Sequence, residues 1–282
     1  MKEEIRSPIT WYGGKFHMSQ KIIEFFPKHQ TYVEVFGGAA HILFKKEKSA
    51  IEIYNDLDEG LVNFFEILRN EEKAKKLISK LKLTPYSRKE HEKCLETWNK
   101  TENKIEKARR WYVSLMQSFS GQFAGSWAYS KSTSRRGMSS NVSKWLRYID
   151  ERILKSIERL RTIQIENLDF RKIISKYDNK DTLFYLDPPY VHNTRVDTNS
   201  YDNEMTNEDH RDLMKILENL EGKFVLSGYD NPIYNEANFN KKTIGEYSKR
   251  ARVTSEKNKR TKGEEIIWFN FNPRQTGQQK LF

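Results

Sequence analysis

The chain has 282 residues, a formal net charge of +11 and one cysteine, Cys94. A single cysteine excludes a disulfide framework within the chain, and no apolar run approaches the length of a membrane-spanning helix. The six histidines are scattered and lack the spacing of a zinc site. We therefore expect a cytoplasmic protein that does not enter a membrane and forms one large α/β domain or a core domain with an insertion.

The first motif in the chain is the run Pro-Ile-Thr-Trp-Tyr-Gly-Gly-Lys at residues 8–15. Trp11 and Tyr12 offer a stacking surface, and the two glycines allow a tight turn. Lys15 adds a cation that suits the carboxylate of an amino-acid-bearing cofactor. A motif of this kind on its own is more often a surface turn, so its meaning depends on the segments that follow.

A predicted strand at residues 32–35 leads into Phe36-Gly37-Gly38-Ala39-Ala40, and a predicted helix follows at residues 41–45. Small residues here let the backbone approach a ligand. A second predicted strand at residues 50–54 ends next to Asp56, which lies 18 residues after Gly38. This spacing is close to that at which an acid meets a ribose hydroxyl in nucleotide-binding units. We therefore predict a nucleotide-like cofactor site that includes Phe36, Gly38 and Asp56. The alternative is that the glycines only shape a turn.

The helical spacing of Leu61, Phe64, Phe65 and Leu68 predicts a helix. After this helix, basic residues clearly outnumber acidic ones. Residues 71–150 hold 18 Lys/Arg against 8 Asp/Glu, and residues 107–149 contain eight aromatic residues and no acid. Basic residues interleaved with aromatics suit a polyanion with stackable bases. The alternative is a solvated basic surface over an aromatic core. The candidate DNA-binding residues are Lys131, Arg135, Arg136 and Lys144.

Further strands are predicted at residues 163–166, 183–186, 224–227 and 266–271, with a helix carrying Leu213, Ile216, Leu217 and Leu220. Alternation of strands and helices favours an α/β fold with a mostly parallel sheet covered by helices. The interval 71–150 interrupts this alternation. We therefore predict a catalytic domain formed by residues 1–70 and 151–282, and a helix-rich basic insertion formed by residues 71–150.

The most informative segment follows the apolar run at residues 183–186 and reads Asp187-Pro188-Pro189-Tyr190. Proline has no N–H, so Pro188 adds a carbonyl acceptor beside the carboxylate of Asp187. Two adjacent acceptors suit an amine with two N–H donors, such as the exocyclic amine of adenine or cytosine. Tyr190 offers a ring on which the base can stack. The alternative is an ordinary turn after a strand, where Pro and Asp are common.

Four segments in this order resemble the DNA adenine methylase (Dam-type) family of adenine-N6 methyltransferases. They read Trp-Tyr-Gly-Gly-Lys at 11–15, Glu-Val-Phe-Gly-Gly at 34–38, Asn-Asp at 55–56 and Asp-Pro-Pro-Tyr at 187–190. Further similarity lies at residues 207–210, 225–227 and 264–270, so the resemblance runs over about the whole chain. It implies a Rossmann-like methyltransferase sheet with helices on both faces, and it makes the basic insertion a target-recognition region.

The resemblance also implies S-adenosyl-methionine as the cofactor, with Trp11, Lys15, Asp56 and Asp187 at positions that contact it. Asp187 to Tyr190 would hold an adenine that has been flipped out of the duplex, because a paired amine cannot be reached. The sequence departs from the family at Ala40, where a second glycine is usual. Alanine adds only a methyl group, so we expect cofactor binding to survive.

The expected partners are double-stranded DNA and a cognate restriction endonuclease, and the expected state is a monomer or weak dimer. The basic loop at residues 249–263 is a further candidate for phosphate contacts. One alternative is methylation of a cytosine amine or of an RNA base. Others are a catalytically silent DNA-binding regulator on the same fold and a nucleotide-binding protein of unrelated function.

Overall fold

The computed structural model describes residues 5–191, 205–248 and 262–273. Contacts divide the chain into two compact units. Unit 1 comprises Met1–Phe16, Gly37–Glu47 and Asp56–Asn167, and unit 2 comprises His17–Phe36, Lys48–Asn55 and Leu168–Phe282. The chain passes between the units immediately after two of the predicted strands, at Phe36 and at Asn55.

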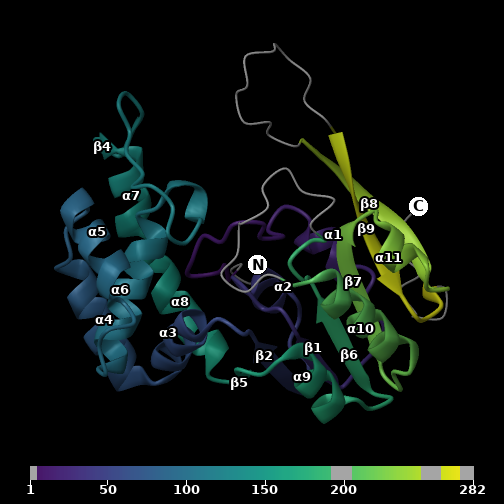
Figure 1. The fold of residues 1–282 in the computed structure, drawn as a ribbon. Coiled ribbons are helices and arrows are strands. Elements are labelled where there is room, and N and C mark those ends of the chain that lie inside the picture. The colour runs from purple at the N-terminus through teal and green to yellow at the C-terminus, as the bar shows by residue number, and fades with distance from the viewer. Residues whose placement is uncertain (1–4, 192–204, 249–261, 274–282) are drawn as a thin grey trace. The chain divides into compact units, whose positions relative to one another are not determined.

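Six strands form the sheet of unit 2, in the order β2-β1-β6-β7-β9-β8 (Figure 1). Their bounds are β1 Thr31–Glu34, β2 Ile51–Asn55, β6 Thr182–Leu186, β7 Lys223–Tyr229, β8 Asn240–Ser248 and β9 Lys262–Phe269. β2, β1, β6 and β7 run parallel, whereas β9 is antiparallel to both β7 and β8. The predicted mostly parallel sheet is confirmed. The last predicted strand, 266–271, is displaced, since β9 begins at Lys262 and ends at Phe269.

Both faces of this sheet are covered by packed side chains. Successive residues of a strand point to opposite faces, so neighbouring residues report on the two sides. Val33 and Phe184 belong to one hydrophobic core with residues of α9 (Phe170–Tyr177), α10 (Asn207–Glu218) and α11 (Pro232–Asn235). Tyr32 and Tyr185 point to the other face, where Phe26 contacts their rings at 5.7 and 6.0 Å between centroids. Phe26 follows the short helix α1 (Ser19–Ile23). The predicted α/β fold with both faces covered is therefore confirmed.

Unit 1 is mostly helical. Its elements are α2 His41–Lys45, α3 Glu59–Arg69, α4 Glu71–Lys82, α5 Arg88–Thr97, α6 Lys104–Met116, η1 Phe119–Gly121, β3 Ser134–Arg135, β4 Met138–Ser139, α7 Ser140–Arg147, the π-helix η2 Tyr148–Arg152, α8 Ile153–Leu160 and β5 Gln164–Glu166. Residues 71–150 are helix-rich, as predicted. The contact unit is wider than this interval, because it also takes in α2, α3, α8 and the N-terminal motif. The division by role into catalytic segments and an insertion stays a prediction.

About half of the aromatic residues between residues 107 and 149 serve the core of unit 1. Trp111, Tyr112, Trp145 and Tyr148 are buried. Phe119 and Tyr129, in contrast, are 63% and 55% exposed. The alternative that these aromatic residues form a core therefore holds for the four buried residues in helices, and it does not hold for Phe119 and Tyr129.

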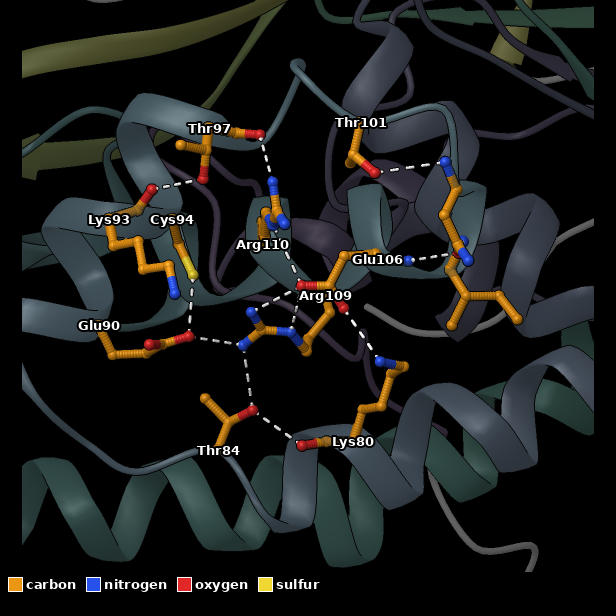
Figure 2. A network of polar contacts seen from close by, with 12 residues as sticks. Lys80, Thr84, Glu90, Lys93, Cys94, Thr97, Thr101, Glu106, Arg109 and Arg110 are labelled. Carbon is orange, nitrogen blue, oxygen red and sulfur yellow. Dashed lines mark hydrogen bonds and ion pairs between the residues drawn. The ribbon is translucent and has the colours of Figure 1, made fainter.

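An ion-pair network ties together the helices α4, α5 and α6 (Figure 2). Arg109 on α6 donates from Nε and Nη2 to Oε1 of Glu106, at 3.0 and 2.8 Å, and from Nη1 to Oε1 of Glu90 on α5, at 2.8 Å. Lys80 on α4 donates to Oε2 of Glu106 at 3.1 Å. Burial raises the pKa of the neighbouring Cys94 thiol to about 12, so this cysteine is unreactive at neutral pH.

Low pH is expected to lower the stability of unit 1, because Glu106 becomes protonated. Burial opposes ionisation of this carboxyl, but its bonds to Arg109, Lys80 and Arg110 prevail and hold its pKa at about 2. A depressed pKa contributes stability above the unfolded value near 4.5, and this contribution is lost as the pH falls toward 2. Glu106→Gln should lower the free energy of unfolding at pH 7 by about 2–3 kcal/mol, with a smaller loss at about pH 3.

Urea unfolding at the two pH values measures this difference. Glu71→Gln is the matched control, because it removes the exposed Glu71–Lys75 pair on α4 and should change stability little at either pH. An equal loss for Glu106→Gln at both pH values would contradict an ionic origin of the effect.

Candidate functional site

Asp187 follows the carboxyl end of β6 and is held by the neighbouring parallel strand. Oγ of Ser227 on β7 donates to Oδ1 of Asp187 at 3.1 Å, and Oγ also lies 3.1 Å from the hydroxyl of Tyr185. Asp187 remains partly exposed, whereas Ser227 and Tyr185 are buried. One carboxylate oxygen is therefore fixed from inside the sheet, and sequence reasoning did not identify Ser227 as its partner.

Tyr190, three residues further along, rests on a second tyrosine. Its ring stacks on that of Tyr229 with centroids 4.0 Å apart and planes inclined by 26°. Its hydroxyl donates to Oε2 of Glu265 at 3.4 Å. Tyr229 and Glu265 are paired across β7 and β9. Two strands thus support Tyr190, and neither supporting residue was predicted from the sequence to act here.

The proline pair between these residues sits at the edge of the sheet, with Pro188 buried and Pro189 partly exposed. The ends of β1 and β6 lie side by side there, because the N–H of Val35 donates to the carbonyl of Tyr185 at 3.0 Å. Phe36 follows Val35 and packs against Phe170, with centroids 6.0 Å apart. The predicted residues Phe36 and Asp187 therefore leave neighbouring parallel strands at the same edge, which is where open α/β sheets bind ligands.

Asn55 fixes the end of β2 at this same edge. Its buried side-chain amide donates to the carbonyls of Val35 and Leu168, at 2.8 and 3.0 Å, and accepts from the N–H of Leu168 at 2.9 Å. Three hydrogen bonds therefore hold the end of β2 to Val35 and Leu168 within unit 2. The signal for Asn55 in the sequence was only its place beside Asp56 in the family resemblance.

In unit 1, Asp56 joins the glycine loop to the start of α3. Its Oδ2 accepts from the N–H of Gly38 at 2.7 Å, and its Oδ1 accepts from the N–H of Asp58 at 2.9 Å. Burial raises the pKa of Asp56, and the N–H donors of Asp58, Gly38 and Leu57 oppose the rise. The predicted pairing of Gly38 with Asp56 is thus a direct hydrogen bond, and the carboxylate keeps some acceptor capacity for a hydroxyl donor.

Trp11 lies against Gly38 at a distance that leaves little room for a side chain. A Cβ atom at Gly38 would stand 3.1 Å from Nε1 of Trp11, and Gly38 has a φ of +46°, a region that favours glycine. Trp11 also stacks on Trp111, with centroids 6.2 Å apart. Lys15 is 7% exposed and Tyr12 is 39% exposed. Unit 1 therefore brings Trp11, Gly38 and Asp56 together.

The predicted cofactor residues divide between the two units. Trp11, Tyr12, Lys15, Gly38 and Asp56 belong to unit 1, and Phe36 and Asp187 belong to unit 2. Each group is ordered by its own contacts, and the role of these residues as cofactor ligands stays a prediction.

The four predicted DNA-binding residues fall into two classes. Lys131, Arg135 and Arg136 are exposed, and Arg136 with Gly137 forms the turn of the β3–β4 hairpin at φ values of 55° and 74°. Arg136 pairs with Glu151 at 3.6 Å. Lys144 is partly buried, with Nζ 5.7 Å from the ring centroid of Tyr148. Residues 249–261 of the predicted phosphate-contacting loop lie outside the described residues.

Within the described ranges, no three His, Cys, Asp or Glu side chains gather as they would around a metal ion. A search of the same residues finds no helix with the length and apolar character needed to cross a membrane.

The sequence matches the model of the D12 class N6 adenine-specific DNA methyltransferase family over residues 11–262. The chain belongs to this family. The match takes in both the Trp11 motif and Asp187–Tyr190, so the predicted family resemblance is confirmed. A D12 class enzyme transfers a methyl group and therefore needs a methyl donor.

A similar curated protein is the modification methylase StsI of Streptococcus sanguinis. It is 24% identical over 208 residues, which cover 71% of this chain and 30% of the relative. The chain thus spans less than a third of the length of that protein.

Ala40, where the family resemblance leads us to expect glycine, has a φ of 55° and a ψ of 35° in the turn before α2. An L-residue in this left-handed region costs about 1–2 kcal/mol, of which glycine would recover part, since it loses about 0.5–1 kcal/mol more conformational entropy on folding. Ala40→Gly should therefore raise the free energy of unfolding by up to about 1 kcal/mol.

Chemical denaturation of Ala40→Gly beside Ala39→Gly tests the argument. Ala39 is equally buried but has no positive φ, so its replacement should destabilise by about 1 kcal/mol. The same sign for both variants would show that backbone strain at Ala40 is not the cause.

Proposed function

We propose that this protein is a site-specific DNA adenine-N6 methyltransferase that uses S-adenosyl-methionine. The observation that carries the proposal is the arrangement at the carboxyl edge of the parallel sheet. There a fixed carboxylate, Asp187, precedes two prolines and a tyrosine ring that rests on Tyr229. Membership of the D12 class family supports adenine, rather than cytosine, as the base.

The residues present suit the proposed cofactor. S-adenosyl-methionine, when bound, supplies an electrophilic methyl group on a sulfonium centre. Trp11 offers an aromatic face, and Lys15 offers a cation for a carboxylate. Asp56 keeps acceptor capacity for ribose hydroxyls on a carboxylate that Gly38 and Asp58 already orient. Gly38, which lies close to Trp11, has no side chain that would keep a ligand away from the backbone of the glycine loop.

Asp187 and the Pro188 carbonyl would act on the target amine. The nitrogen of an exocyclic amine is a poor nucleophile because its lone pair is delocalised into the ring. Hydrogen bonds from its two protons to Asp187 and Pro188 would localise that pair and aim it at the methyl group. Ser227 orients the carboxylate of Asp187 for this role, because it donates to Oδ1. Tyr190 would hold the plane of the flipped base.

Double-stranded DNA is the proposed partner, bound in part by the cations of unit 1. Lys131, Arg135 and Arg136 are exposed candidates for its phosphates or base edges. The name of the relative, a modification methylase, supports a role beside a cognate restriction endonuclease. Action as a monomer or weak dimer in the cytoplasm belongs to the same proposal.

The test is transfer of label from methyl-labelled S-adenosyl-methionine to duplex DNA, followed by digestion to nucleosides. Label on N6-methyladenine supports the proposal, and label on cytosine alone or on RNA alone contradicts it. Calorimetry with S-adenosyl-methionine separates the enzyme from a silent DNA-binding regulator, which would bind DNA without the cofactor. Preference for ATP or NAD would indicate an unrelated nucleotide-binding protein.

A further inference from the structure

Three cations of unit 1 surround one buried tyrosine. Cζ of Arg152, Nζ of Lys144 and Cζ of Arg147 lie 4.4, 5.7 and 5.8 Å from the ring centroid of Tyr148. We call these four residues the Tyr148 cluster. Because all three charges lie within 6 Å of one point, they share a small volume at the junction of α7, η2 and α8.

The acids nearest in sequence are engaged elsewhere. Asp150 pairs with Lys82 at 3.4 Å, and Glu151 pairs with Arg136 at 3.6 Å. Among the residues that the structure describes, none of the three cations of the Tyr148 cluster forms an ion pair. Their positive charge is therefore not balanced by the local fold.

Burial and mutual repulsion make this arrangement costly. Burial lowers the pKa of Lys144, and the charges of Arg147 and Arg152 lower it further. Burial likewise lowers the pKa of Arg152, with Arg147 and Arg6 adding repulsion. Nε of Arg147 is buried and has no hydrogen-bond partner among the described residues. All three cations are partly buried, and buried charges and donors are normally paired, so the cluster favours a partner of negative charge.

The backbone at this place is also unusual. Tyr148–Arg152 form a π-helical turn between two α-helices. Such turns are rare and occur often at functional sites. Lys144 and Arg147 lie four residues and one residue before Tyr148, and the turn places Arg152, at its end, on the same ring. Cation–π contacts alone stabilise a single pair modestly and do not explain why three like charges are kept together.

We propose that the Tyr148 cluster binds one phosphate group of the DNA backbone. A phosphodiester offers oxygens that accept several N–H donors at once, and guanidinium groups match them in geometry. Lys144, Arg147 and Tyr148 also belong to residues 107–149, which contain eight Lys/Arg and no acid, and Arg152 follows this stretch closely. The proposal rests on the proposed function, in that it takes DNA as the ligand, and it adds Arg147 and Arg152 to the residues proposed to contact DNA.

The experiment measures the affinity of the full chain for fluorescein-labelled duplex DNA between about 50 and 200 mM KCl. Arg152→Met keeps an unbranched apolar side chain that can pack like the aliphatic stem of arginine, but it removes the charge. It should weaken binding roughly tenfold and reduce the slope of log K against log salt by about one. Adding Arg147→Met should reduce the slope little further, because both residues serve one phosphate.

Lys73→Gln is the matched control, since Lys73 is an exposed cation on α4 and should leave the slope unchanged. An unchanged slope for Arg152→Met and for the double variant overturns the proposal, as does a slope that falls by about one for each residue separately. If Arg152→Met does not fold, Lys144→Gln replaces it under the same criteria. Parent protein that binds DNA with this dependence but transfers no methyl group would refute the proposed function and leave the phosphate site standing.

Discussion

Replacing Asp187 with asparagine should abolish most methyl transfer, with kcat lowered roughly 10²–10³-fold. The change preserves the shape of the side chain but removes the negative charge. The amide can also turn its NH2 toward the substrate amine, which would replace an acceptor by a donor. Oγ of Ser227, at 3.1 Å from Oδ1, favours the oxygen of the amide on its own side and so presents the NH2 to the substrate.

The assay is single-turnover methylation of duplex DNA at saturating S-adenosyl-methionine, with DNA affinity measured in parallel. Asp181→Asn is the matched control, because Asp181 is exposed and directly precedes β6, at the opposite end from Asp187. It should keep full activity. Asp187→Asn should bind DNA nearly as well as the parent, since its loss is at the reacting amine. Full turnover by Asp187→Asn would show that the carboxylate has no part in the reaction.

Much of this site could be predicted from the sequence because its residues follow strands. An apolar run that ends in Asp-Pro-Pro-Tyr, or a strand followed by Phe-Gly-Gly, carries a local signal. The supporting residues carry no local signal of their role, although Ser227 and Glu265 fall within stretches of the family resemblance. Ser227, Tyr229 and Glu265 reach the motif through strand pairing over 36 or more residues of sequence, and such long-range register is not encoded in a short window.

Strand β8 was missed for a different reason. It reads Asn-Lys-Lys-Thr-Ile-Gly-Glu-Tyr-Ser, and of residues 240–245 only Ile244 is buried. β8 pairs with β9 on one side only, and an edge strand is commonly protected by charged residues. The charges that protect it also hide the alternation by which a strand is predicted. In the same way Lys144 resembled Lys131 in the sequence, and only the packing of Tyr148 distinguishes the two.

Removing the ring of Tyr190 should have the second largest effect. Stacking of a base on an aromatic side chain is worth about 1–3 kcal/mol, so Tyr190→Ala should lower kcat/KM roughly 10- to 100-fold. Tyr190→Phe should lose little, because the hydroxyl is 3.4 Å from Glu265, near the limit for a hydrogen bond. Steady-state kinetics with duplex DNA gives both values, and cofactor affinity by calorimetry should be the same for both variants.

The variant Tyr229→Leu tests the support of the Tyr190 ring without removing the ring itself. The two rings now lie 4.0 Å apart, so a base on the outer face of Tyr190 would continue one stacked column. With leucine beneath it, Tyr190 keeps its ring but loses an aromatic neighbour that restrains its tilt. We expect a loss between those of Tyr190→Phe and Tyr190→Ala, seen mainly in kcat because a misaligned base still binds. If Tyr190→Ala is as active as Tyr190→Phe, the ring does not hold the base, and Tyr229 then has only a structural role.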